Sequence, residues 1–250
     1  MDVNELMILL ADKMEYVGVL MPSLLEGAMM TIKIFVLTLV FALPLGLPFA
    51  LGSISKFAPF RFISKVYIWV FRGTPLMLQL FFFYFYIPIA TGIMMDAFTT
   101  AIITFVLNYA AYLAEIYRGG IESIDKGQYE AAQTLGLSKN QTMFGIILPQ
   151  TIKRVLPAVS NETITLVKDT ALVSALSVGE LLKASRGAVI RDQMATAFVI
   201  AAAIYLVLTF ALTLVTNNLE KRYSKYEGRA AAEPVKQRRA SLVWALLSSR

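Results

Sequence analysis

Cysteine and histidine are both absent from the 250 residues of this sequence. Without cysteine no disulfide can form, and the lack of both residues excludes zinc sites of the Cys/His kind and haem held by His or Cys. Ser-His-Asp and Cys-His catalysis are excluded for the same reason. Only Asp, Glu, Lys and Tyr remain for acid–base work. We expect no metal site and no catalytic residue in this chain.

A phosphate-binding loop is also missing. No stretch fits Gly-x-x-x-x-Gly-Lys-Ser/Thr, the pattern whose backbone amides would cradle the phosphates of a nucleotide. We therefore expect no cofactor bound by this chain and no hydrolysis of ATP by the usual route. Any ATP-driven step would have to take place on a partner polypeptide.

Apolar residues, by contrast, are abundant. They make up 57% of the chain, whereas a soluble globular domain has about 45–50%. They gather in five runs of about twenty residues, the length of helix that crosses ~30 Å of hydrocarbon. We predict an all-α integral membrane protein with five transmembrane helices. The runs are residues 28–51, 66–89, 97–117, 156–178 and 196–216. The fourth run is the least apolar, so an even number of spans with this run as a re-entrant piece is the alternative.

Basic residues are distributed unequally over the loops between these runs. Sixteen Lys and Arg residues lie between the first and second runs, between the third and fourth, and after the fifth, against four on the other side. Because cytoplasmic loops carry the excess of basic residues, we predict the N-terminus outside and the C-terminus in the cytoplasm. The same bias accounts for the net charge of +6 without any binding of nucleic acid.

The two ends of the chain differ from its apolar middle, residues 23–226, which we predict to be the transmembrane domain. Residues 1–22 lack a basic start, and charged residues interrupt their apolar character, which argues against a signal peptide. We predict an amphipathic segment at the membrane surface there. Residues 227–250 are predicted to be a cytoplasmic tail, flexible in its first part, with an apolar run at 242–247 that suits the membrane interface.

The connection between the third and fourth runs, residues 119–154, reads as two short helices. Gly136 lies where the first helix must turn, a position that favours a positive φ angle. Pro149 is expected to limit the second helix. Each helix begins with a predicted capping box, made by Asp125 with Gln128 and by Ser138 with Gln141. From this local chemistry alone, an ordinary cytoplasmic hairpin is the alternative to a surface that docks a partner.

Polar residues form one stripe on the third run and one on the fourth. At 100° per residue the two stripes fall within arcs of about 80° and about 120°. Ionisable groups inside a membrane usually face the bundle interior or water, so the stripes are expected to line a shared pathway. Their members are Thr104, Asn108, Tyr112 and Glu115 in the third run and Asn161, Glu162, Thr165, Lys168 and Asp169 in the fourth.

Two further segments have plain structural readings. Pro75 at a first helical position, preceded by Thr74 as N-cap, predicts an ordinary helix start. Arg72 near the cytoplasmic face agrees with the distribution of basic residues. The aromatic block at residues 80–86 is expected to pack within the protein and to contact lipid rather than to bind a ligand.

The cytoplasmic loop also carries a pattern with fixed gaps. Glu130-Ala131-Ala132 is followed after three residues by Gly136, after nine more by Ile146, and after one more by Leu148-Pro149. This pattern resembles in full the EAA motif of ABC importer permeases. Other segments resemble the polar amino acid branch of that family, the histidine- and glutamine-type permeases. They are residues 71–76, 79–82, 114–120 and 168–174, and the resemblance covers about residues 22–226.

The resemblance implies a type I ABC importer permease, a multi-pass protein of the cytoplasmic (inner) membrane. Residues 128–137 would be a coupling helix that docks on a separate ATPase subunit, which binds ATP and Mg. The residues implied in this coupling are Gln128, Glu130, Ala131, Ala132 and Gly136. The implied partners are two copies of the ATPase, a second permease subunit that is identical or homologous, an extracytoplasmic amino-acid-binding protein, and membrane lipid.

An amino acid is a zwitterion, and the polar stripes offer groups for both of its charges. Lys168, Asn108 and Asn161 would donate to a carboxylate, and Glu115, Glu162 and Asp169 would accept from an ammonium group. In the structural alternative, Lys168 and Asp169 pair with neighbours to hold the bundle or a dimer together. Glu115 would then lie at the cytoplasmic interface beside Arg118.

Two other functions remain as alternatives. A channel or sensor that works without ATP would need neither the EAA spacing nor an ATPase partner. An exporter permease would have longer spans that reach into the cytoplasm. Within the importer reading, glutamine, histidine, a basic amino acid and cystine all remain open as the solute.

Overall fold

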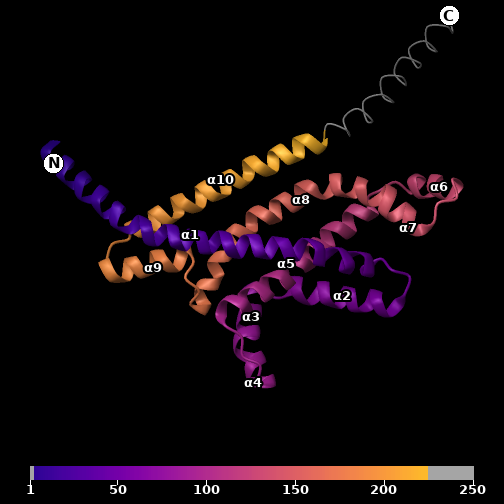
Figure 1. Ribbon diagram of the computed structural model, residues 1–250, viewed down its shortest axis with the longest axis horizontal. Helices are drawn as coiled ribbons and strands as arrows, with labels where there is room; N and C mark the ends of the chain where they lie inside the picture. Colours follow the sequence, from indigo (N-terminus) through magenta and orange to yellow (C-terminus); the bar gives the residue numbers. More distant parts are fainter. Residues whose placement is uncertain (1–2, 225–250) are drawn as a thin grey trace, which may run out of the picture.

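The computed structural model describes the backbone of residues 3–224 and the side chains of residues 15–223. This part of the chain is helical throughout and contains no strand, which confirms the predicted all-α class. The predicted tail at residues 227–250 lies outside the described residues. Figure 1 shows long helices lying side by side, with the pair α6 and α7 at one end and the N-terminal part of α1 at the other.

The helices follow one another in a simple order. The long ones are connected by short turns, and three short segments depart from α-helical geometry: η1 and η2 are π-helical, and η3 is a 3₁₀ helix. The elements are α1 (Val3–Ser53), α2 (Ala58–Gly73), α3 (Leu76–Phe81), η1 (Phe82–Tyr86), α4 (Ile87–Thr91), α5 (Ala97–Glu122), α6 (Lys126–Thr134), α7 (Lys139–Thr142), η2 (Met143–Ile147), α8 (Leu148–Asp169), η3 (Thr170–Leu176), α9 (Leu181–Asp192) and α10 (Thr196–Ser224).

Three helices of the described chain are long and apolar enough to cross a membrane. They are Glu15–Ser53 within α1, α5, and Thr196–Tyr223 within α10. A bent pair, α2 with the helical stretch Leu76–Thr91, would make a fourth span if it is counted as one. Helix α8 does not reach this standard, so the count of five spans and the orientation of the termini stay predictions.

The second apolar run, predicted as one span with a helix start at Pro75, consists of two helices at a sharp angle. The helix ends at Gly73, resumes at Leu76, and bends by 106° between the two parts. Proline lacks a backbone N–H, and the residue before it disfavours the α conformation. Thr74 and Pro75 both have extended backbone, so the N-cap of α3 is Pro75 and not Thr74 as predicted.

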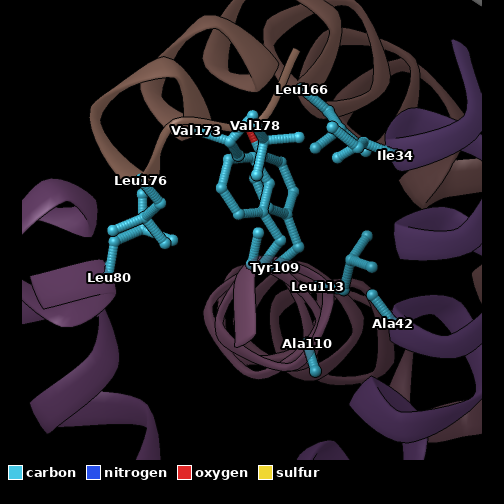
Figure 2. Close-up of a cluster of buried hydrophobic side chains, with 12 residues drawn as sticks. Ile34, Ala42, Leu80, Tyr109, Ala110, Leu113, Leu166, Val173, Leu176 and Val178 are labelled. Atoms are coloured by element: carbon cyan, nitrogen blue, oxygen red, sulfur yellow. The ribbon is translucent and has the colours of Figure 1, made fainter. Parts of the chain in front are cut away.

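Helix α5 lies at the centre of the main core. Its buried face carries small residues as well as Phe105 and Leu113, and Leu166 of α8 and Leu80 of α3 belong to the same cluster. Figure 2 shows Leu80 facing Leu176 and Ile34 facing Leu166 around Tyr109. Helix α1 approaches α5 closely, because a Cβ added at Gly46 would lie 3.0 Å from the Leu113 Cβ. Tight packing of small residues is typical of helices associating in membranes.

Helices α9 and α10 are attached by a buried carboxylate. Glu180 is completely buried, and its oxygens accept hydrogen bonds at 2.7 Å from the backbone N–H groups of Leu182 and Lys183 at the start of α9. The Tyr205 hydroxyl of α10 donates to the same carboxylate at 2.8 Å. Ala197 and Ala201 of α10 also belong to one buried cluster with Leu20, Leu24 and Ala28 of α1. The first half of α10 is therefore fixed to α1 and α9.

The second helix in the connection at residues 119–154 does not end at Pro149, contrary to our expectation. Helix α7 continues through the π-helical turn η2 directly into α8, so that the backbone is helical from residue 139 to residue 169. The Leu148 N–H donates to the Met143 carbonyl across this wider turn. A proline inside a helix cannot donate to the carbonyl four residues before it, and its ring clashes with that carbonyl. Here that carbonyl belongs to Gly145, which lies inside the wider π-turn. The result is one continuous rod from the loop into the bundle.

Candidate functional site

Helix α6 begins with a single cap rather than the predicted capping box. The Asp125 side chain accepts a hydrogen bond from the Gly127 N–H at 2.6 Å. The Gln128 side-chain oxygen instead accepts from the Gln150 amide of α8 at 3.2 Å, which ties the start of α6 to the rod. At α7 the predicted box is confirmed, with the Ser138 hydroxyl and the Gln141 amide oxygen both accepting from backbone N–H groups.

Gly136 ends α6 with a positive φ of 73°, as the sequence predicted. The Gly136 N–H donates to the Gln133 carbonyl at 3.0 Å, and the Leu137 N–H donates to the Ala132 carbonyl at 3.1 Å. This is the Schellman pattern that closes the C-terminus of a helix. No atom lies within 4 Å of where a Cβ would be, so the backbone conformation, and not a lack of space, requires glycine here. We call residues 126–138 the elbow.

One face of α6 rests on the rest of the chain. Ala132 is buried, and Tyr129 packs against a cluster that contains Ile121, Ile124 and Ile147. Ala132 is thus small because α6 lies close to its own protein, and it is not available to a partner. The prediction placed it among the coupling residues without distinguishing the two faces.

The other face of α6 is exposed. Gln128, Glu130 and Ala131, all predicted coupling residues, are exposed there. Leu135 at the tip has 77% of its surface exposed, and Phe144 in η2 has 59%. Neither is among the predicted coupling residues, although Leu135 lies within the predicted coupling helix at residues 128–137 and next to the turn glycine. Leu135 and Phe144 are thus exposed apolar side chains on or next to a mostly polar helical segment.

The break between α2 and α3 leaves backbone carbonyls that need donors. The Gln79 side-chain amide donates to the Phe71 carbonyl at 2.9 Å and to the Thr74 carbonyl at 3.1 Å. Asn108 of α5 donates to the Gln79 side-chain oxygen at 2.9 Å and to the Phe71 carbonyl at 3.2 Å. Within a membrane such groups must be satisfied inside the protein. Asn108, a predicted pathway residue, therefore holds the broken helix in place.

Gln79→Leu is expected to lower the free energy of unfolding by about 1–3 kcal/mol. It removes the side-chain donor to the Thr74 carbonyl, one of the two donors to the Phe71 carbonyl, and the acceptor of one Asn108 hydrogen bond. The thermal unfolding of the purified full-length chain in detergent measures the change. Gln133→Leu is the matched control, because Gln133 is exposed on α6. Equal melting of the Gln79→Leu protein and the unchanged protein would contradict the role given to this amide.

The stripe on α5 divides into a packed part and an open part. Thr104 is buried and its hydroxyl donates to the Thr100 carbonyl at 2.8 Å. Tyr112 is partly exposed, with the Arg72 guanidinium 5.5 Å from its ring centre. The Glu115 carboxylate lies 3.6 Å from Arg72 and accepts from Arg118 at 2.5 Å. The alternative that placed Glu115 beside Arg118 therefore agrees with the geometry.

The stripe on α8 presents its carboxylates next to this open part. Glu162 and Asp169 are seven residues apart, hence on one face of α8, and Glu162 interacts electrostatically with both Asp169 and Arg72. The Asp169 carboxylate accepts from the Tyr109 hydroxyl of α5 at 2.7 Å. Tyr109 is not among the predicted pathway residues, because it lies outside the polar arc of the third run. The remaining predicted members are exposed: Asn161, Thr165 and Lys168.

One face of the bundle thus combines both signs of charge from three helices. Arg72 at the end of α2, Tyr112 and Glu115 on α5, and Glu162 and Asp169 on α8 contribute to it. A molecule carrying both an ammonium and a carboxylate would find acceptors and a donor within this face. Helix α8 also links the face directly to the elbow, because the rod is unbroken between them.

Known proteins resemble this chain over most of its length. The L-cystine transport system permease protein TcyB of Bacillus subtilis (strain 168) is 40% identical over 207 residues, which is 82% of this chain and 88% of that protein. The arginine transport system permease protein ArtQ of the same organism is 41% identical over 203 residues, 80% of this chain and 92% of that protein. A putative glutamine transport system permease protein GlnP of Rickettsia bellii (strain RML369-C) is 36% identical over 214 residues, 83% of this chain and 97% of that protein.

Solved structures and a family profile agree with these relatives. A crystal structure of an amino acid ABC transporter with histidines superposes with a TM-score of 0.77 at 33% identity, covering 85% of this chain and 97% of that one. The MetNI methionine ABC transporter, at 19% identity and a TM-score of 0.68 over 81% of this chain and 97% of that one, shares the fold. The profile of the binding-protein-dependent transport system inner membrane component matches residues 42–225. The chain therefore belongs to the family of binding-protein-dependent transport system inner membrane components.

Proposed function

We propose that this chain is the permease subunit that passes a polar amino acid across the inner membrane, driven by ATP hydrolysis on a separate ATPase subunit. The observation that supports it best is the elbow. A short helix closed by Gly136 presents Glu130, Ala131 and Leu135 to the outside of the protein and joins directly to the rod. Such an elbow can receive a displacement from a docked motor and transmit it into the bundle.

The rod gives this transmission a physical path. The helical backbone runs from Lys139 to Asp169, so a displacement of the elbow moves the Glu162 and Asp169 carboxylates with it. Alternating access is a shift between two packings of the same chain, and the motor must bind one packing better than the other. ATP binding on the ATPase pair would favour the packing open to the outside, and hydrolysis would restore the other.

The solute is proposed to be a polar amino acid. The relatives named above are permeases for cystine, arginine and glutamine. In this chain Glu162 and Asp169 would accept from the ammonium group, and Arg72 is placed to donate to the carboxylate. Further contacts along the path are proposed for four other residues: Tyr112, Asn161, Thr165 and Lys168. Asn108 is better explained by its bonds at the helix break.

The proposed assembly contains two permease subunits, identical or homologous, and two copies of the ATPase. An extracytoplasmic binding protein delivers the amino acid to the outer mouth. Five spans per permease, with the N-terminus outside and the C-terminus in the cytoplasm, place the elbow on the side where ATP is available. Under this topology, residues 1–22 would lie at the external surface of the inner membrane.

Reconstitution tests the proposal. Proteoliposomes containing the chain, its ATPase and its binding protein are tested with labelled cystine, arginine, histidine and glutamine. At least one of these amino acids is expected to accumulate, and only when ATP is present. Accumulation should cease when the ATPase subunit is omitted or when its ATP cannot be hydrolysed. Equal uptake without the ATPase would identify a channel or a facilitator instead and would overturn the proposal.

A further inference from the structure

An apolar groove lies between α1, α8 and α10. Its cavity volume is about 590 Å³. The first half of α10 is packed on α1 through Ala197 and Ala201, and toward its C-terminal end α10 diverges from α1 (Figure 1). The groove follows this divergence. Its walls include Phe35 and Leu47 of α1, Ile152 and Val159 of α8, and Leu212 and Leu219 of α10.

The threonine hydroxyls in the groove wall already donate hydrogen bonds within their own helices, so they need no partner from an occupant. The Thr151 hydroxyl donates to the Ile147 carbonyl at 2.9 Å, and the Thr163 hydroxyl donates to the Val159 carbonyl at 2.8 Å. The Thr216 hydroxyl likewise donates to the Thr213 carbonyl at 3.2 Å. With these bonds made inside the helices, the groove presents an apolar surface. A hydrocarbon chain suits it, whereas an amino acid does not.

The groove runs along the bundle toward the elbow end. On α8 it extends from Leu148, the first residue after η2, to Thr163, which corresponds to about 22 Å at 1.5 Å per residue. One leaflet of the hydrocarbon core is about 15 Å thick. The groove is longer than this, so with the elbow on the cytoplasmic side it has the direction of an acyl chain of the inner leaflet and enough length to hold one.

Basic and aromatic side chains follow the groove at its elbow end. Arg222 comes seven residues after Val215, and Tyr223 comes four residues after Leu219, so both continue the groove face of α10 by one turn. Glu220 is the acidic residue of the same turn of α10. Arg and Tyr at the end of a span are typical interfacial anchors, and basic clusters on the cytoplasmic side attract anionic headgroups.

We propose that this groove binds one acyl chain of an anionic phospholipid from the cytoplasmic leaflet, with the phosphate at Arg222. The lipid fills the space that α1, α8 and α10 leave between them. The inference rests on the cytoplasmic placement of the elbow in the proposed function, and it does not depend on which solute is carried.

Quenching of tryptophan by brominated lipids measures the preference directly. The chain has two Trp residues, at positions 69 and 244, and both are replaced by Phe before Leu212→Trp introduces a reporter in the groove. The full-length chain is placed in bilayers that contain brominated phosphatidylglycerol or brominated phosphatidylcholine. At this reporter the anionic lipid is expected to bind about five-fold more strongly, the factor that one basic residue near the surface provides.

Two variants make the result specific. Arg222→Gln is expected to remove the preference at the Leu212→Trp reporter. Val207→Trp is the matched control on α10, because Val207 is exposed and does not line the groove, and there both lipids should quench equally. Equal quenching by both lipids at both reporters would overturn the proposal. So would the absence of quenching at position 212, which would show that a second copy or another part of the chain covers the groove.

The assay contains no ATPase and no solute, so its outcome is independent of the uptake experiment. A lipid preference without uptake would leave the groove assigned and refute the transport proposal. Uptake without a lipid preference would support the transport proposal and refute the lipid site in the groove.

Discussion

Gly136→Val is expected to reduce ATP-driven uptake by at least about tenfold while the protein still inserts into the membrane. The glycine has a φ of 73°, and a residue with a Cβ is disfavoured in this region by roughly 1–2 kcal/mol, a factor of about 5–30. A β-branched side chain adds to that cost. The strain would open the Schellman closure, in which the Leu137 N–H donates to the Ala132 carbonyl. Leu135 and Glu130 would then no longer meet the ATPase in the geometry that transmits force.

Gly92→Val is the matched control for this experiment. Gly92 has the same φ of 73° and, like Gly136, has no atom within 4 Å of a would-be Cβ. It follows α4, in the connection to α5 and far along the chain from the elbow. Uptake into proteoliposomes, normalised to the amount of inserted protein, should fall for Gly136→Val and remain for Gly92→Val. Normal uptake with Gly136→Val, or an equal loss in both proteins, would contradict a coupling role for the elbow.

Asp169→Asn and Glu162→Gln are each expected to lower uptake by roughly ten- to a hundred-fold, since a hydrogen bond to a charged group is worth about 1.5–3 kcal/mol. Both changes keep the size of the side chain. Asparagine at position 169 can still accept from the Tyr109 hydroxyl, so the packing between α5 and α8 should survive. The basal hydrolysis of ATP by the complex should persist, because the elbow is unchanged.

A second Tyr–Asp pair in the chain provides the control. Asp192 at the end of α9 accepts from the Tyr16 hydroxyl at 2.8 Å, close to the 2.7 Å of the Tyr109–Asp169 bond. Hydrogen bonds from Arg191 and Tyr16 hold the pKa of the Asp192 carboxyl below its usual value. Asp192→Asn removes a carboxylate of the same kind outside the proposed path and should leave uptake nearly intact. If Asp192→Asn impaired uptake as much as Asp169→Asn, the loss would reflect structure and not contact with the solute.

The elbow was the part of the site most accessible from sequence. Its chemistry is local: the Ser138–Gln141 box and the positive φ at Gly136 depend on residues within a few positions of each other. Which face of α6 is buried depends on Ile121, Ile124 and Ile147, which come from other elements. For this reason the sequence identified Ala132 as part of the motif but not as a residue buried against its own chain.

The broken second span shows where sequence patterns are insufficient. The apolar residues continue on both sides of Thr74-Pro75, so the run resembles one helix with a start inside it. The bend is stabilised because Gln79 and the distant Asn108 donate hydrogen bonds to the carbonyls that the break leaves without helical partners. A polar stripe likewise indicates that a helix face avoids lipid, but not whether it meets another helix or water. Thr104 and Asn108 meet protein, whereas Tyr112 and Glu115 face the open side.

A crosslink from the tip of the elbow tests the central claim most directly. The chain contains no cysteine, so Leu135→Cys introduces a unique thiol at the most exposed apolar position of the elbow. Paired with single cysteines across the surface of the ATPase, it is expected to form a crosslink that stops uptake and that reduction reverses. Reaction of this thiol with a membrane-impermeant reagent from outside intact cells, together with no crosslink to the ATPase, would contradict the account.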